Sequence, residues 1–179
     1  PNEPYQSMEG QPLNTNFGYK ALGLYTKEEV EKVNAGELPA PDFINEVKPG
    51  YIRYKDMNGD GVINTNDQLP IGYPTVPQVN FAGQLGLRYK GWSFSSTWQG
   101  ATQVSRQISS FWRETFRTQG HNGILKYQFE DRWTQEKIDQ GIEPDFPRMT
   151  LLDHDYNHRT NSSYWVRDAS YLRMKSAEI

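Results

Sequence analysis

The chain contains no cysteine among its 179 residues. This absence excludes disulfide bonds, thiolate metal sites and cysteine nucleophiles together, and it is compatible with an oxidising compartment. An excess of positive charge is also lacking, because the formal net charge is -3 at pH 7. The sequence therefore offers no broadly basic surface, and we expect no nucleic-acid partner.

The sequence also lacks any apolar run approaching the roughly 20 residues of a membrane-spanning helix. This excludes a helical membrane protein but leaves barrel strands open, because those need only about 10 residues of alternating pattern. Aromatic residues, by contrast, make up 13% of the chain, with 11 tyrosines and 5 tryptophans. Such residues suit both a membrane interface and a sugar-binding surface.

The chain has no initiator methionine and no signal peptide at its start, and residues 175–179 read as the middle of a strand. We therefore expect a fragment of a longer protein, with any targeting signal lying upstream.

Residues 56–67 have the oxygen spacing of a calcium loop of the EF-hand type. Oxygen-bearing side chains fall at loop positions 1, 3, 5, 9 and 12, and Gly61 occupies position 6, where the backbone needs a positive φ. Calcium requires six to eight oxygen ligands. The predicted ligands are Asp56, Asn58, Asp60, the carbonyl of Val62, Asn64 and Asp67.

This loop departs from the EF-hand pattern in two ways. Asp67 stands where a bidentate glutamate is usual, so we expect weak affinity, as in extracellular modules. Pro70, Pro74 and Pro77 exclude the helix that follows the loop in an EF-hand. A hydrated Asn/Gly turn that caps a strand is the alternative interpretation.

Residues 78–100 alternate apolar and polar side chains with the period of a strand, interrupted by a two-residue turn at Lys90 and Gly91. The alternation predicts a hairpin with one apolar and one hydrophilic face. Soluble sandwiches share this pattern, but the strand length and the aromatic pair beside the turn favour a membrane barrel. The expected apolar pairs are Tyr89 with Trp92, Leu87 with Phe94, and Gly83 with Trp98.

Other local signals are weaker. Thr26 and Glu29 form a capping box that opens a short helix, which ends near Ala35. A second helix is expected over 122–133. Residues 165–179 have strand character, with a slip after Met174 that indicates a β-bulge.

Catalysis finds little support. His154 and His158 have the spacing of a zinc pair, but no helix pattern or general base accompanies them, so we interpret them as loop residues and expect no enzyme. The candidates for ligand contact are aromatic residues of the long loop region, although packing of the loop against a partner protein would explain them equally well: Phe111, Trp112, Phe116, Trp133 and Tyr156.

Several separated segments together resemble the C-terminal half of the SusC/RagA family of TonB-dependent outer-membrane transporters. The order and spacing of these segments are more specific than any one of them. The matching residues are 50–63, 71–72, 84–100, 131–134, 147–148 and 163–175.

The resemblance implies an all-β fold that is part of a transmembrane antiparallel barrel, 22-stranded in the family, with long extracellular loops and short helices. The expected regions, within a single C-terminal receptor part at 1–179, are a strand, helix and extracellular calcium-loop region at 17–77, a hairpin at 78–104, a long extracellular loop at 105–164 and a truncated strand at 165–179.

By the same resemblance, the chain contributes strands and loops to uptake of glycan or peptide fragments across a Gram-negative outer membrane. The implied partners are a SusD-like surface lipoprotein, TonB through missing N-terminal regions, membrane lipid and the ligand. A structural Ca²⁺ would hold one extracellular loop in shape. The alternative is a secreted calcium-binding β-rich carbohydrate-binding module, or a dockerin-like module, although a dockerin needs a second loop and a helix after each.

Overall fold

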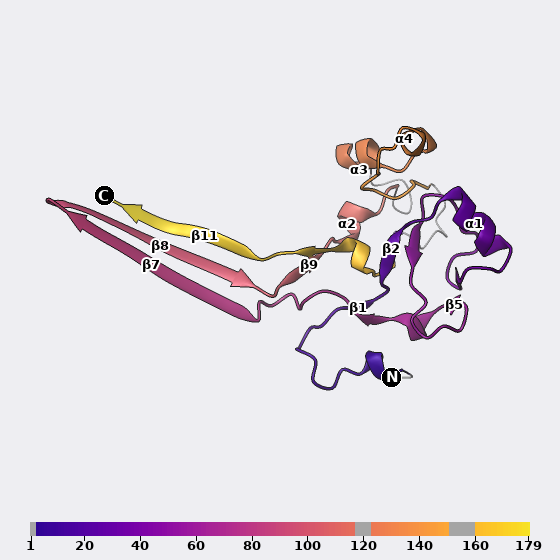
Figure 1. Cartoon of the computed structure of the whole chain (residues 1–179), viewed down its shortest axis with the longest axis horizontal. Helices are drawn as coiled ribbons and strands as arrows, with labels where there is room; N and C mark the ends of the chain where they lie inside the picture. Colours follow the sequence, from indigo (N-terminus) through magenta and orange to yellow (C-terminus); the bar gives the residue numbers. More distant parts are fainter. Residues whose placement is uncertain (1–2, 117–122, 151–159) are drawn as a thin grey trace. The chain divides into compact units, whose positions relative to one another are not determined.

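The computed structural model describes residues 3–116, 123–150 and 160–179. Its contacts divide the chain into two compact units, each built from segments that lie far apart in the sequence (Figure 1). Unit 1 combines Pro1–Met8, Phe17–Ile71 and Ile108–Trp165, and unit 2 combines Glu9–Asn16, Gly72–Gln107 and Val166–Ile179.

The first half of unit 1 consists of short paired strands around one helix. Two antiparallel pairs and one parallel pair bring strands that are distant in the sequence together. The elements are η1 (Pro4–Gln6), β1 (Phe17–Gly18) with β6 (Leu69–Pro70), β2 (Ala21–Leu24) with β4 (Ile52–Tyr54), α1 (Lys27–Asn34), β3 (Ala40–Pro41) with β5 (Val62–Ile63), and η2 (Thr65–Asp67).

Helix α1 has the ends that the sequence predicts. The Thr26 side chain accepts from the Glu29 amide, while the Glu29 carboxylate accepts from the Thr26 amide. The helix ends before Gly36, whose φ of 75° suits glycine. Val30 is buried and Val33 packs beside it, so the helix is docked through two apolar side chains.

The second half of unit 1 contains the short helices α2 (Ser110–Arg113), α3 (Lys126–Asp131) and α4 (Gln135–Asp139), followed by η4 (Ser163–Trp165). Phe146 and Trp165 from this half are buried with Tyr19, Ile52 and Tyr54 of the first half. Burial of each such side chain contributes about 1.5–3 kcal/mol. The two halves therefore share one core.

Unit 2 contains a three-stranded antiparallel sheet in the order β11-β8-β7. Its strands are β7 (Val79–Tyr89), β8 (Trp92–Thr102) and β11 (Tyr171–Glu178). In the same unit, β9 (Ser105–Gln107), which follows β8, pairs with β10 (Val166–Asp168), which precedes β11. Lys90 and Gly91 both have positive φ, 47° and 88°, as a type I′ turn requires.

The hairpin register is the one predicted from the alternation. Tyr89 lies opposite Trp92, Leu87 opposite Phe94, and Gly83 opposite Trp98. The register of β11 against β8 shifts between Met174 and Ser176, which confirms the predicted bulge.

Three sequence predictions differ from the structure. The expected all-β fold is instead β-rich and mixed, with four short α-helices among the described residues. The helix expected over 122–133 is only Lys126–Asp131, because the Arg132 backbone turns extended and the Trp133 amide bonds to the Phe146 carbonyl. Trp165 lies in the buried turn η4 and not in a strand.

Within the described ranges, no helix combines the length and apolar character needed to cross a membrane.

Candidate functional site

Three features of the described residues invite a functional interpretation: the loop at 56–67, a cleft around Trp133, and the two-faced sheet of unit 2. The first two lie within unit 1.

The loop at 56–67 is shaped by its own carboxylates. Asp56 accepts backbone amides from Gly59 and Gly61 through its two oxygens, at 2.6 and 2.9 Å. Both glycines have positive φ, 76° and 85°, so the chain can curl around the Asp56 side chain. Asp56 therefore holds the first half of the loop.

A repeated turn continues around the loop. Asn58, Asp60 and Asn64 each accept the amide two residues further on, at 3.1, 2.8 and 2.7 Å. The Val62 amide and the Asn58 side chain hold the pKa of Asp60 below its usual range. Backbone amides thus already orient the side-chain oxygens of five of the six predicted calcium ligands. The sixth, Val62, lies between them in β5.

Asp67 has a different role from the other carboxylates of the loop. Its side chain is fully buried, and its two oxygens accept the Met57 and Asn64 amides at 2.7 and 2.8 Å. It therefore ties the beginning of the loop to its end. Each oxygen keeps one further lone pair, so this clamp is compatible with a ligand role but does not require one.

The N-terminal turn η1 lies against the end of the loop. The Tyr5 hydroxyl donates to the Asn66 carbonyl at 2.7 Å, and the Gln6 side chain donates to the Thr65 and Asn66 carbonyls. The sequence did not predict these hydrogen bonds, because residues 1–16 carry no periodic pattern. They link η1 to the end of the loop and stabilise it there.

No group of three His, Cys, Asp or Glu side chains is arranged as a metal site within the parts of the chain that the structure describes. A cation in the loop would therefore depend on Asn58, Asn64 and backbone oxygens as much as on Asp56 and Asp60. That composition suits a hard cation such as Ca²⁺, which takes amide and carbonyl oxygens readily. The donor set fits the ion.

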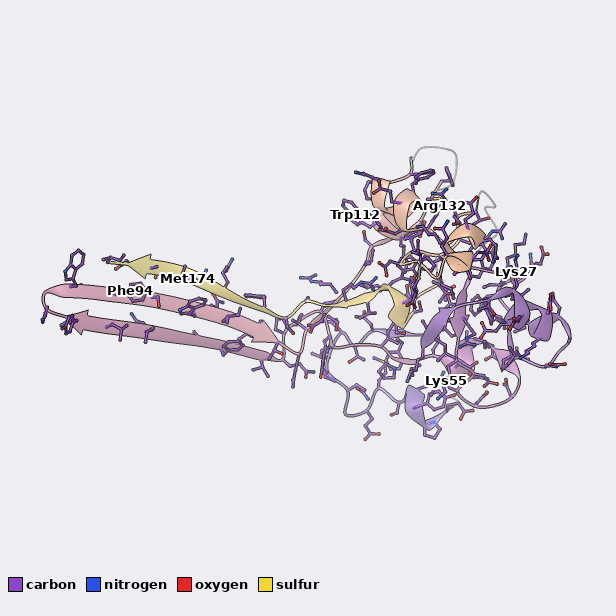
Figure 2. All side chains as sticks on the ribbon, turned by 45° about the horizontal axis from the view of Figure 1, so that its top comes forward. Lys27, Lys55, Phe94, Trp112, Arg132 and Met174 are labelled. Atoms are coloured by element: carbon purple, nitrogen blue, oxygen red, sulfur yellow. The ribbon has the colours of Figure 1, made fainter. Side chains whose placement is uncertain are left out.

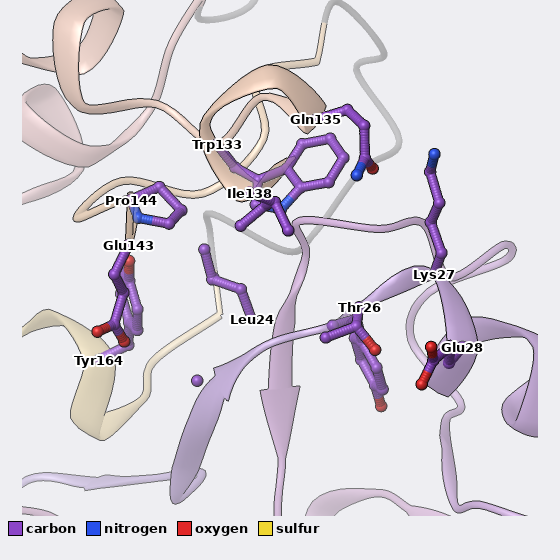
Figure 3. A pocket seen from close by; sticks show the side chains of 12 residues that line it. Leu24, Thr26, Lys27, Glu28, Trp133, Gln135, Ile138, Glu143, Pro144 and Tyr164 are labelled. Atoms are coloured by element: carbon purple, nitrogen blue, oxygen red, sulfur yellow. The ribbon is translucent and has the colours of Figure 1, made fainter. Parts of the chain in front are cut away.

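A cleft in unit 1 surrounds Trp133. A pocket of about 470 Å³, hereafter the ring pocket, has an apolar interior formed by Leu24, Ile138 and Pro144 together with the rings of Trp133 and Tyr164. Figure 3 shows polar side chains around this interior, with Lys27 and Glu28 towards one side and Glu143 towards the other.

A second hollow of about 430 Å³ adjoins the ring pocket, and both share Lys27, Trp133 and Gln135. We call it the cationic compartment, because Lys27, Arg132 and Arg148 line it and no described acidic residue does. The Arg148 guanidinium lies 5.7 Å from the Trp133 ring centroid, and that of Arg132 lies over the Phe129 ring.

Backbone hydrogen bonds fix this cleft to the core. The Trp133 amide donates to the Phe146 carbonyl at 2.7 Å, and the Arg148 amide donates to the Gly50 carbonyl at 2.8 Å. The Gly50 amide in turn donates to the Tyr25 carbonyl. Trp133 was among the predicted ligand aromatics, but Lys27 and Arg148 were not, because they come from distant segments without a shared motif.

Figure 2 shows the side chains of the sheet of unit 2, and the register places apolar and polar side chains on opposite faces. One face, hereafter the apolar face, carries nine exposed large hydrophobic residues: Val79, Phe81, Leu85, Leu87, Tyr89, Trp92, Trp98, Leu172 and Met174. Ser96 also lies on this face but is buried, and its hydroxyl accepts the Trp98 indole N–H at 3.1 Å.

The opposite, polar face carries side chains such as Gln84, Arg88, Thr97 and Arg173. Soluble monomers rarely leave a continuous apolar surface of this kind uncovered. The apolar face therefore needs a nonpolar partner, whereas the polar face suits water.

Some predicted residues fall outside the described ranges. His154, His158 and Tyr156 belong to this group. Phe111 and Trp112 are half exposed on α2, their rings 5.2 Å apart, and they do not line the ring pocket or the cationic compartment.

Comparison with known proteins identifies related sequences. No protein-family model matches the chain. TonB-dependent receptor P26 of Formosa agariphila is 30% identical over 171 residues, which cover 95% of this chain and 16% of that protein. TonB-dependent receptor P3 of the same organism is 24% identical over 170 residues, covering 94% of this chain and 15% of that protein.

The chain thus spans about a sixth of the length of these curated relatives. Both relatives are named as receptors and not as enzymes. The chain is a distant homologue of one segment of TonB-dependent receptors.

Proposed function

We propose that this chain is part of an importer in a Gram-negative outer membrane that works through TonB. The observation that carries the proposal is the similarity to two TonB-dependent receptors along 95% and 94% of the chain. A match of this extent includes both the compact residues of unit 1 and the sheet of unit 2.

The sheet of unit 2 supports this proposal physically. An outer-membrane strand places apolar side chains towards lipid and polar side chains towards the interior, alternating along its length. The strands β7, β8 and β11 have this alternation, and Tyr89 and Trp92 lie at the turn, where an aromatic girdle would lie. Within the described residues, β7 and β11 are sheet edges, so neighbouring strands of a barrel would complete their hydrogen bonding.

More specifically, we propose a SusC/RagA-type importer of glycan or peptide fragments that acts with a SusD-like surface lipoprotein. The support is the order of matching segments from residue 50 to residue 175. TonB would act through regions outside this chain.

A structural Ca²⁺ in the loop at 56–67 forms part of the same proposal. Asp56, Asn58, Asp60, Asn64 and the Val62 carbonyl would bind the ion, and Asp67 would hold the loop closed around it. With β4 before it and a proline-rich segment after it, the loop lacks the helices that a calcium sensor moves. The ion would stabilise one loop shape.

Paired substitutions test the membrane placement in the full protein that contains this chain. Leu85→Lys places a charge on the apolar face, and Gln84→Lys places it on the polar face one residue away. A lysine facing lipid costs about 2–4 kcal/mol near the bilayer centre, so Leu85→Lys should reduce the amount of folded protein in the outer membrane, while Gln84→Lys should not.

Two outcomes would contradict the proposal. One is equal tolerance of both lysines. The other is recovery of the unmodified protein as a soluble secreted species, which would favour the β-rich carbohydrate-binding module instead. Loss of ligand uptake on deletion of TonB, with the protein still in the membrane, would test the import step.

A further inference from the structure

The cleft around Trp133 combines two different environments. On one side, the cationic compartment presents Lys27, Arg132 and Arg148. On the other, the ring pocket presents an apolar interior with carboxylates at its margin. Trp133 lines both, so a ligand seated on its ring would reach each of them.

Ion pairing within the described chain does not account for the grouping of the three cations. Lys27 begins helix α1, where the positive end of the helix dipole disfavours a cation. Neither Lys27 nor Arg148 forms an ion pair with an acidic residue of the described chain. Arg132 contacts the Phe129 carbonyl and ring, neither of which carries a formal negative charge. Their combined charge is available to an anion.

The ring pocket favours a different chemistry. Glu28, Glu143 and the Gln135 carbonyl offer hydrogen-bond acceptors around the apolar surface of Leu24 and Ile138. A pyranose ring matches this arrangement, because its C–H faces are apolar and pack on aromatic or aliphatic surfaces while its hydroxyls donate at the edge.

From these two environments we infer that the cleft binds an anionic saccharide. Its carboxylate or sulfate group lies in the cationic compartment, held by Lys27 and Arg148, and the adjoining ring lies in the ring pocket against Trp133. An acidic peptide is disfavoured, because it lacks the ring hydroxyls that would donate to Glu28 and Glu143. For its biological role the inference rests on the import function proposed above, and it specifies the substrate class.

Calorimetric titration of the full protein that contains this chain, purified in detergent micelles, tests the inference. The probes are trigalacturonate, its fully methyl-esterified neutral form, a sulfate-bearing galactose trisaccharide and a glutamate hexapeptide. The variants are Lys27→Gln and Arg148→Gln, with Lys32→Gln on the same helix as the matched control, since it removes the same charge from outside the cleft.

An acidic saccharide should bind, and its affinity should fall about tenfold in either cleft variant but not in Lys32→Gln. Whichever of the uronate and the sulfate-bearing trisaccharide binds with the higher affinity identifies the class of anion. Equal binding of the neutral ester, preference for the glutamate peptide, or unchanged affinity in both cleft variants would overturn the inference. Melting curves confirm that the variants fold, and membrane fractionation of the full protein tests the import proposal separately.

Discussion

The indole of Trp133 lies directly on the Cα of Gly50, so that a Cβ at position 50 would collide with the ring. Gly50 also has a φ of 87°, and its carbonyl accepts the Arg148 amide. One glycine thus positions both the aromatic ring and one cation of the cleft.

Gly50→Ala should destabilise the chain and disturb the cleft. The positive φ alone costs an alanine about 1–2 kcal/mol, and displacement of the Trp133 ring adds to it. Gly36→Ala is the control, because Gly36 has a φ of 75° with no atom near the added Cβ. Urea unfolding should show a larger loss for position 50 than for position 36, and equal losses would contradict the packing of Trp133 on Gly50.

A related contact stabilises the sheet of unit 2, where the Phe81 ring covers Gly100 on the apolar face. Gly100→Ala should displace this ring and cost about 1–3 kcal/mol by overpacking. Gly86→Ala, on the polar face with open space around it, should be nearly neutral. Unfolding in detergent micelles, followed by tryptophan fluorescence, measures both; a harmless Gly100→Ala would show that the ring can move away freely.

The sheet and helix α1 could be predicted from the sequence because their determinants are local. Alternation with period two and a Lys90–Gly91 turn fix the register of β7 against β8 within a few residues of one another. The capping box at Thr26 and Glu29 is equally local. The elements that could be predicted are therefore those with a strong local sequence pattern.

The cleft could not be predicted, because it depends on the core. The residues around the cleft approach one another only after Phe146 and Trp165 pack with Tyr19 and Tyr54, and no periodic pattern in the sequence indicates that packing. These residues are Lys27, Gly50, Trp133 and Arg148. The extent of the helix at 126–131 was missed for the same reason, since a long-range hydrogen bond from Trp133 to Phe146 ends it. The loop at 56–67 was found by its spacing, although its calcium remains a prediction.

Calcium should raise the melting temperature of the chain through the loop at 56–67. A ligand at 100 times its dissociation constant stabilises the folded state by about 2.7 kcal/mol. Replacing both Asp56 and Asp60 by alanine should abolish this response, whereas Thr65→Ala, an exposed loop position outside the ligand set, should preserve it. A melting temperature indifferent to calcium in the unmodified chain would refute the site.

Asp67 should matter even without calcium. Asp67→Asn replaces one acceptor oxygen by an amino group, so one of the Met57 and Asn64 amides loses its partner in a buried position. An unsatisfied buried amide costs about 1–3 kcal/mol. Urea unfolding in a calcium chelator should show this loss; if it appeared only when calcium was present, Asp67 would be a ligand and not a clamp.

Alkaline pH should destabilise unit 1 through its buried tyrosines. Burial raises the pKa of Tyr25 to about 12, with Arg53 opposing the shift, and burial also raises the pKa of Tyr54. In the unfolded chain a tyrosine ionises near pH 10. Between about pH 10 and 12 the unfolded state therefore binds fewer protons than the folded state, so stability falls as pH rises.

The contribution of Tyr25 is fully present below about pH 10 and is lost by about pH 12, amounting to on the order of 2 kcal/mol. Tyr25→Phe should remove its share of this loss while leaving unfolding at pH 7 nearly unchanged, because no described residue accepts from its hydroxyl. Tyr73→Phe, at a half-exposed site, is the control and should leave the alkaline slope intact. If the slope of unfolding free energy against pH were the same in Tyr25→Phe as in the unmodified chain, Tyr25 would ionise as readily in the folded state as in the unfolded one, and the burial of its hydroxyl in the core would be refuted.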